Sequence, residues 1–256
     1  MTNGTVARRS SPHALWMARA MARNDLSPLA PEDLPRLEAI CSPRAVRAGT
    51  VLLTAGEDVS SVLVVRHGEI HLAARSTVLR RQTVAVVRAG GVVGDIPMLC
   101  DKPMPFDAIT ARDTVVLQLD RGRLVELLRT SPTISLRWTT SVARRLEENQ
   151  QRILAMLTMD LTGQVATLLL DEREASGDGP PVVRLSHAVI AQLLGARRPS
   201  VSRVMRDLRR RNLVRGGYAE IRLLDLPRLA ALVGRDGITP PCGQGAETRA
   251  APTLAS

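Results

Sequence analysis

Arginine side chains are concentrated between residues 195 and 215, where eight arginines stand against a single acid, Asp207. A guanidinium group donates paired hydrogen bonds that fit both the guanine edge and the phosphate group. Serine hydroxyls in the same segment can bind phosphate oxygens. These residue types therefore predict binding to double-stranded DNA. The eight arginines are Arg197, Arg198, Arg203, Arg206, Arg209, Arg210, Arg211 and Arg215.

The spacing of apolar residues predicts that two helices and a turn carry these arginines. Ser186 stands where it can cap the first helix, and Ile190 and Leu194 give that helix an apolar stripe. Gly195 supplies the left-handed backbone that a tight turn requires. The second helix has one apolar face, spaced at i, i+3, i+4 and i+7, formed by Val201, Val204, Met205 and Leu208. Such a pair is a helix-turn-helix, which docks in the major groove of DNA.

The residues expected to face DNA lie at the amino end and on the outer face of the second helix. The alternative is a basic surface hairpin without a function. The cap, the turn glycine and the matched apolar faces favour DNA binding over that alternative. The predicted contact residues are Ser186, Arg197, Arg198, Pro199, Ser200, Ser202, Arg203 and Arg206.

Length and composition limit the other classes of function. The chain has 256 residues, enough for two domains with separate cores, and a formal net charge of +10. No apolar run is long enough to span a membrane. No nucleophile–base set, metal-ligand spacing or complete phosphate loop is visible, so we do not expect an enzyme. The three cysteines are far apart, which favours a reducing cytoplasm over a disulfide framework or an iron–sulfur cluster: Cys41, Cys100 and Cys242.

Short apolar runs separated by turn residues occupy residues 50 to 120. This spacing predicts a sandwich or jelly-roll barrel and disfavours alternating strands and helices. A helix over Arg121–Arg129 is expected to follow. The predicted strands are Thr50–Thr54, Ser61–Arg66, Glu69–Ala74, Gln82–Arg88 and Thr114–Leu119.

A long helix is predicted from Ile134 to about Thr158, because neither proline nor glycine interrupts that stretch. Its apolar stripe is typical of a helix that pairs with a partner, and Asn149 within the stripe could fix the register. The alternative is a helix packed on its own barrel. The stripe consists of Trp138, Val142, Leu146, Asn149, Ile153 and Met156.

Composition also predicts the remaining boundaries. Asp160 can cap a helix over Gly163–Leu170, and Glu174–Pro181 reads as a loop. The run Leu213–Leu223 contains a Gly-Gly turn and reads as the hairpin of a winged helix. The expected parts are a basic flexible extension (1–26), a barrel (27–130), a dimerisation helix (131–159), a DNA-binding domain (160–234) and a disordered tail (235–256).

This order of elements resembles the Crp–Fnr family of transcription regulators, over about residues 27 to 233 and most strongly in Ser141–Leu146, Asp160–Gly163 and the helix pair. The resemblance implies an α+β fold: an N-terminal β jelly-roll barrel like those that bind cyclic nucleotides, a long dimerisation helix and a C-terminal winged helix-turn-helix. It implies a homodimer on inverted repeats, with Arg198 and Arg203 reading bases and Ser200 contacting a phosphate. Where the cyclic-AMP receptor has glutamate, this chain has Pro199, so its operator is expected to differ at that base pair.

The family's phosphate-binding cassette is altered in this chain. In the family it opens with Gly-Glu and carries Arg-Ser ten residues later, whereas here the opening is Gly94-Asp95 and the later positions hold Pro105 and Phe106. Burying an unpaired phosphate there would be unfavourable, so the usual mode of cyclic-AMP binding is not expected. If a ligand does bind, Lys102 is the nearest spare cation, provided that its loop rearranges. The candidate ligand residues are Gly94, Asp95, Lys102, Asn149 and Gln150, the last two at adenine-contacting positions of the family.

Two hypotheses about function follow. The first is a homodimeric, sequence-specific regulator that binds inverted repeats without catalytic activity. The second is a cyclic-AMP-responsive regulator in which the ligand switches DNA affinity from the barrel. The expected partners are double-stranded DNA, a second copy of the chain and RNA polymerase, with no membrane, and no cofactor is expected apart from possible cyclic AMP. His67 and His71 are expected at the surface, and Cys100 is either a reactive thiol or an inert one.

Overall fold

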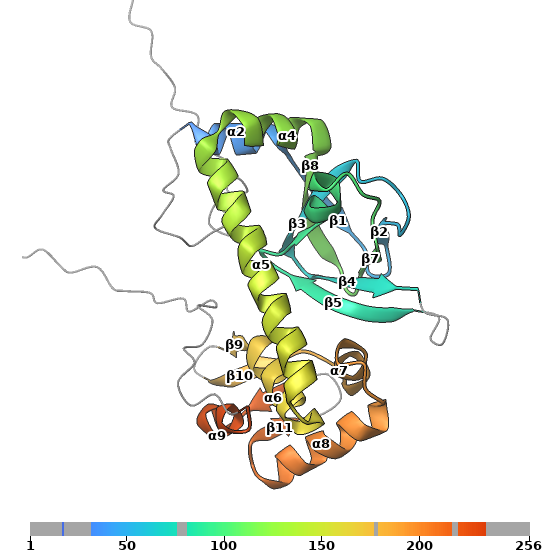
Figure 1. The fold of residues 1–256 in the computed structure, drawn as a ribbon, viewed down its shortest axis with the longest axis vertical. Helices are drawn as coiled ribbons and strands as arrows, with labels where there is room; N and C mark the ends of the chain where they lie inside the picture. Colours follow the sequence, from blue (N-terminus) through green and yellow to red (C-terminus); the bar gives the residue numbers. More distant parts are fainter. Residues whose placement is uncertain (1–16, 18–31, 76–80, 177–178, 217–219, 234–256) are drawn as a thin grey trace, which may run out of the picture. The chain divides into compact units, whose positions relative to one another are not determined.

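The computed structural model describes Met17 and residues 32–75, 81–176, 179–216 and 220–233, which fall into two compact units (Figure 1). The first unit covers Met1–Gln151 and the second Arg152–Ser256. The expected basic extension and C-terminal tail lie outside the described residues, apart from Met17. Within the described residues, no helix is both long enough and apolar enough to cross a membrane.

Two four-stranded sheets form the body of the first unit. Their strand orders are β1-β8-β3-β6 and β2-β7-β4-β5, and every paired strand is antiparallel. This arrangement confirms the expected N-terminal barrel of an α+β protein. The strands are β1 Cys41–Val46, β2 Val51–Leu53, β3 Ser61–His67, β4 Glu69–Ala74, β5 Gln82–Arg88, β6 Val92–Val93, β7 Asp107–Thr110 and β8 Thr114–Asp120.

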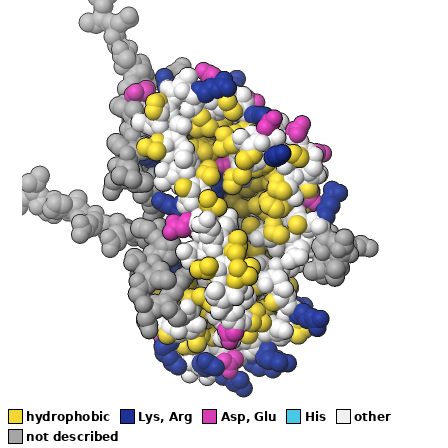
Figure 2. All heavy atoms as spheres, viewed as in Figure 1, with side chains coloured by type: hydrophobic (Ala, Val, Ile, Leu, Met, Phe, Trp, Pro, Cys, Tyr) yellow, Lys and Arg dark blue, Asp and Glu magenta, His cyan; other side chains and the backbone are white. Residues whose placement is uncertain are grey.

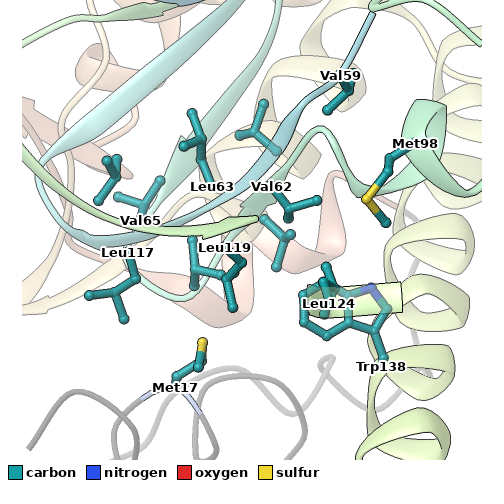
Figure 3. Packing of buried hydrophobic residues seen from close by; sticks show 14 of the residues in the cluster. Met17, Val59, Val62, Leu63, Val65, Met98, Leu117, Leu119, Leu124 and Trp138 are labelled. Carbon is teal, nitrogen blue, oxygen red and sulfur yellow. The ribbon is translucent and has the colours of Figure 1, made fainter. Parts of the chain in front are cut away.

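The core of this unit lies between the two sheets and beneath the helices. Val62, Leu63, Leu117 and Leu119 from β3 and β8 are almost wholly buried, and Trp138 reaches the same cluster (Figure 3). Burial of such side chains stabilises a fold by about 1.5–3 kcal/mol each. The helices of the unit are α2 Asp33–Ile40, α3 Asp95–Leu99, α4 Arg121–Thr130 and the first part of α5 Pro132–Thr158.

The apolar stripe of helix α5 is buried in one part and exposed in another. Trp138 is 3% exposed, and Val142 packs against the same barrel core. Further along, Leu146 and Ile153 are 57% and 56% exposed, and Asn149 is also exposed. The amino-terminal part therefore packs on its own barrel, whereas pairing of the exposed Leu146 and Ile153 with a partner helix stays a prediction.

In the second unit, Asp160 follows the end of the long helix and caps the next one. Its Oδ1 accepts a hydrogen bond of 2.8 Å from the backbone N–H of Gly163, as the sequence predicted. The unit adds one small antiparallel sheet of strand order β11-β12-β10-β9. Its elements are α6 Leu161–Asp171, β9 Glu174–Ser176, β10 Gly179–Val183, α7 His187–Leu193, α8 Arg198–Arg210, β11 Val214–Gly216, β12 Ile221–Leu223 and α9 Leu226–Ala231.

The predicted loop over Glu174–Pro181 is wrong, because β9 and β10 form an antiparallel pair there. Gly179 pairs with Ser176 and Val182 with Glu174, and the register shifts between these two pairs. The two prolines of β10 lie inside that irregular stretch, where the missing N–H groups cost no regular ladder bond. The glycine and prolines of this stretch led to the prediction of a loop, but β10 accommodates them at its irregular end.

Candidate functional site

Helix α8 separates its side chains into a buried face and an exposed face. Val201, Met205 and Leu208 are at most 1% exposed, and Val204 beside them is half-buried. Among the residues assigned to DNA contact, the exposed ones are Arg197, Arg198, Pro199, Ser200, Arg203 and Arg206. Six of the eight residues that the sequence assigned to DNA contact are therefore accessible together around the amino end of one helix.

The turn before α8 has the geometry that the sequence predicted. The hydroxyl of Ser186 accepts a 3.2 Å hydrogen bond from the N–H of Val189 and so caps α7. Gly195 has φ +60°, the left-handed conformation. The N–H of Ala196 donates to the carbonyl of Ala191 at 2.9 Å, which closes the end of α7. Each of these contacts is local and fixes the entry to α8.

The hydroxyl of Ser202, like that of Ser186, is engaged within the protein. Its Oγ lies 3.3 Å from Nδ1 of His187, the first residue of α7, and both residues are half-buried. Burial lowers the pKa of His187, with further contributions from the charges of Arg209 and Arg198. The sequence analysis did not identify His187. Its position directly after the capping residue Ser186 places it at the start of α7 and could have drawn attention to it. The imidazole positions Ser202 by linking α7 to α8.

The charge on α8 is only partly neutralised. Asp207 binds Arg210 at 2.9 Å and Arg211 at 2.8 Å, near the carboxyl end of the helix. Within the described ranges, Arg198, Arg203 and Arg206 form no ion pair. Figure 2 shows Lys and Arg side chains gathered over α8. Exposed guanidinium groups at a helix amino end form a surface suited to phosphates and guanine edges.

The cassette of the barrel has the opposite character, because its acid is buried and paired. Asp95 is the first residue of α3, directly after Gly94, and is 1% exposed. Its Oδ1 accepts from Nη1 of Arg145 at 3.0 Å, and its Oδ2 accepts from Nη2 of Arg145 and from Nε1 of Trp138, the latter at 3.1 Å. Both carboxylate oxygens are thus engaged by side chains of α5.

Residues 105 to 107 contribute two apolar side chains and one buried carboxylate to the same cassette. Phe106 is half-buried and packs against the barrel core. The next residue, Asp107, is 1% exposed, and its Oδ2 lies 3.2 Å from Nη2 of Arg81. Pro105 offers neither a charge nor an N–H. A cyclic nucleotide does not fit this residue set, because its phosphate would meet two buried carboxylates, and the arginines beside them, Arg145 and Arg81, are already paired with these carboxylates.

The remaining ligand candidates are exposed, whereas Asp95 is buried. Lys102 is exposed in the turn after α3, and its backbone N–H donates to the carbonyl of Pro97 at 2.9 Å. Asn149 and Gln150 are exposed on α5. The sequence did not anticipate the partners that Asp95 has. Arg145 and Trp138 lie 50 and 43 positions away, and only folding brings them to the cassette.

Two other predictions about possible sensor residues can be compared with the structure. His71 is half-buried rather than free at the surface, because its Nε2 lies 2.8 Å from Oε1 of Glu69. Cys100 is exposed, whereas burial together with the charge of Glu38 raises the pKa of Cys41 to about 11, which keeps that thiol protonated. Among the described residues, no group of three or more His, Cys, Asp or Glu side chains could hold a metal ion.

A groove lies next to the amino-terminal part of α5. It has a volume of about 370 Å³ and is mostly apolar. Figure 2 shows hydrophobic side chains gathered in a hollow beside that part of the helix. Leu136 on α5 is 51% exposed. The groove is lined by Leu99, Leu128, Ser135, Trp138, Thr139 and Val142.

Comparison with known protein families gives two matches that follow one another along the chain. Residues 43–131 match the model of the cyclic nucleotide-binding domain. Residues 163–232 match the model of the Crp-like helix-turn-helix domain. The first match covers the barrel strands from within β1 to β8, and the second covers α7, α8 and the hairpin of β11 and β12.

Among curated proteins, the chain is 36% identical over 218 residues to the HTH-type transcriptional regulator Cmr of Mycobacterium tuberculosis, covering 85% of this chain and 87% of that protein. It is 24% identical to the CRP-like cAMP-activated global transcriptional regulator of the same species, over 84% and 96% of the two chains. Both alignments extend across the two units.

Solved structures of similar fold include a CRP/FNR-family transcriptional regulator from Thermus thermophilus, with a TM-score of 0.63 and 25% identity over 77% of this chain and 100% of that one. FixK2 from Bradyrhizobium japonicum matches with a TM-score of 0.67 at 23% identity, over 75% and 97% of the two chains. Together with the relative at 36% identity, these findings place the chain in the Crp/Fnr family of DNA-binding transcription regulators, which are not enzymes.

Proposed function

We propose that this regulator binds inverted-repeat operators as a homodimer and does so without a cyclic nucleotide. The observation that carries the proposal is the exposed face of α8, where Arg198, Arg203 and Arg206 have no acid partner among the described residues. Such a face in the major groove supplies both affinity for phosphates and recognition of bases. We further expect RNA polymerase as a partner and the cytoplasm as the location.

Within this proposal, Arg203 reads a base and the residues around the amino end of α8 fix the register. Arg203 is exposed on the outer face, one turn beyond Ser200. Ser200 and the helix amino end bind phosphate oxygens. Pro199 offers no acceptor, so the operator does not require a cytosine at the base pair that it faces. Ser202 acts through its contact with His187, which sets the position of its hydroxyl.

The second copy is expected to cover the exposed apolar part of α5. Leu146, Ile153 and Leu157 recur at i, i+7 and i+11 and are 56–78% exposed. An uncovered leucine and isoleucine stripe at this spacing is typical of a helix that pairs with another helix. The groove beside Trp138 extends this surface toward α3 and α4.

The independence from ligand rests on the cassette. Some relatives carry the words cAMP-activated in their names, which supports the second hypothesis as an alternative. In this chain the acid of the cassette is engaged by Arg145 and Trp138, and Phe106 occupies the position of a phosphate-binding side chain. A ligand can shift an equilibrium only by its difference in affinity for the two states, and a site without a counter-charge offers little difference.

The experiment is selection of bound fragments from a random double-stranded library, with and without cyclic AMP. We expect an enriched inverted repeat with half-site centres about 34 Å apart or a small multiple of that distance. The same motif is expected in both arms. Enrichment of a single unpaired half-site would contradict the dimer, and enrichment only with cyclic AMP would contradict ligand independence.

A further inference from the structure

The last two turns of α5 belong to the second unit, which starts at Arg152. Ile153 and Leu157 in these turns are 56% and 78% exposed, and the proposed dimer places them against the second copy. Ala155 lies between them in the sequence, on the opposite side of the helix, and is 5% exposed. The same short stretch therefore has one face for a partner and one face packed inside its own unit.

Gln164, near the start of α6, bonds to the end of α5. Its Nε2 donates to the carbonyl of Met156 at 3.1 Å and to that of Met159 at 2.9 Å. Met156 is one of the last four residues of α5, whose carbonyls have no N–H partner within a helix. The backbone N–H of Gln164 also donates to the carbonyl of Asp160 at 3.0 Å. Side chain and backbone of this residue thus fix the joint between the last turns of α5 and α6.

Two further features hold α5 against α6. Nη2 of Arg152 lies 3.3 Å from Oε1 of Glu172, the residue directly after α6, and both side chains are at most 25% exposed. At the other end, a Cβ atom on Gly163 would lie 3.1 Å from Cβ of Met159, so the backbone approaches that side chain closely. A void of about 10 Å³ beside Arg152 and Gln164 has room for about one water molecule. The joint is therefore bonded at both ends of α6 and closely packed.

We propose that Gln164 locks this joint, so that pairing of Ile153 and Leu157 with the second copy sets the half-site spacing that the operator must have. One extra base pair moves two half-sites about 3.4 Å apart and turns one relative to the other by about 34°. A locked joint cannot follow that change, whereas a loose joint follows it at little cost. The inference rests on the proposed function, because it needs a homodimer on an inverted repeat. Gln164 is thus a positioning residue, which acts on DNA binding through the joint.

The test is the affinity of the full-length dimer for the selected operator and for operators with one base pair added or removed between the half-sites. We expect the wild-type chain to bind both altered operators at least about tenfold more weakly. Gln164→Met nearly keeps the size of the side chain but removes its N–H donors, and should reduce this ratio to about threefold or less. The dissociation constant of the dimer, measured by sedimentation, should stay unchanged.

Two variants serve as controls. Gln164→Lys restores an N–H donor at the end of a long side chain and should recover most of the spacing preference. Gln118→Met removes a glutamine contact of the barrel, where Nε2 of Gln118 donates to Oγ of Ser61 at 3.2 Å, and should leave the ratio at its wild-type value. Urea unfolding ranks the stability of all variants, because a general loss of stability weakens binding to every operator alike.

Each other outcome contradicts a definite part of the proposal. A wild-type dimer that binds all three spacings equally would overturn the locked joint. An unchanged ratio in Gln164→Met, or equal reductions in Gln164→Met and Gln118→Met, would overturn the role of Gln164. A ratio that falls together with dimer stability would overturn the positioning role by assigning Gln164 to the dimer contact. A wild-type chain that selects no inverted repeat would instead overturn the proposed function.

Discussion

The cassette of the barrel and the helix pair use charge in opposite ways. In the cassette, Asp95 is buried and both of its oxygens are bonded to side chains of α5. On α8, Arg198 and Arg203 are exposed and have no acid partner among the described residues. A charge that is satisfied inside the fold stabilises or positions that fold, whereas an unsatisfied surface charge is available to a partner. The difference supports the proposal that this chain binds DNA through the exposed face of α8 and that Asp95 serves as a structural contact of the barrel.

The largest expected effect comes from breaking the cassette contact. Asp95→Ala leaves the guanidinium of Arg145 and the indole N–H of Trp138 without their acceptor, and removing one partner of a buried ion pair costs about 3–5 kcal/mol. Urea unfolding should report this loss. Asp101→Ala is the control, because Asp101 is 86% exposed in its pair with Arg121, and exposed pairs contribute at most about 1 kcal/mol. Equal losses for the two variants would mean that the cassette contact is no stronger than a surface pair.

The next effect concerns the partner-facing part of α5. Leu146→Asp would bury a carboxylate in the proposed helix–helix interface, and we expect the dimer dissociation constant to rise by about a hundredfold or more. Sedimentation over a concentration series measures this change. Arg144→Asp alters an exposed residue two positions earlier, on another side of the helix, and should leave the dimer intact. A dimer that tolerates Leu146→Asp would place the interface elsewhere.

On α8, two substitutions are expected to separate base recognition from phosphate binding. Arg203→Ala should weaken operator binding by about 1–3 kcal/mol and relax the preference at one base pair. Arg210→Ala should weaken all duplexes alike and lower the salt slope by about one unit. Titrations on operator and random duplex compare the two variants. An equal loss on both DNAs for Arg203→Ala would assign that arginine to the backbone.

The smallest expected effect is the pH dependence that His187 gives to the second unit. Burial and the nearby arginines lower its pKa, so the folded unit prefers the neutral imidazole. Below the ordinary histidine pKa of about 6.5, the unfolded chain binds a proton more readily, and stability falls as the pH drops from there toward the lowered folded pKa. His187→Gln should flatten this decline in unfolding midpoints, while His67→Gln, at an exposed residue of the barrel, should not.

The helix pair could be predicted from sequence because every contact that defines it is local. The cap of Ser186 on Val189, the left-handed Gly195 and the apolar spacing of α8 all lie within about two dozen residues. The five predicted barrel strands were likewise found within one residue of their expected ends, because alternation and turns are local signals. Local sequence patterns were sufficient to predict these elements, because their defining contacts join residues that are close in the sequence.

Elements without a clean local pattern were missed. Strand β1 contains Pro43 and leaves most of its side chains exposed, so it lacks the alternation of a half-buried strand. Helix α9 was overlooked although Asp225 caps it through the N–H of Arg228, a signal that the sequence does carry. The link of Asp95 to Trp138 joins residues 43 positions apart, and no spacing rule predicts such a pair. The environment of Asp95 in the cassette is therefore set by tertiary contacts, which local sequence patterns do not predict.

The measurement that tests the central claim most directly is the dissociation constant for the selected operator, determined with and without millimolar cyclic AMP on the same dimer. Because Asp95 is already engaged by Arg145 and Trp138 and Phe106 stands at the family's phosphate-binding position, we predict values that agree within about twofold. A tightening of tenfold or more, which is about 1.4 kcal/mol of differential affinity, would contradict the account and make the barrel a working cyclic-nucleotide sensor.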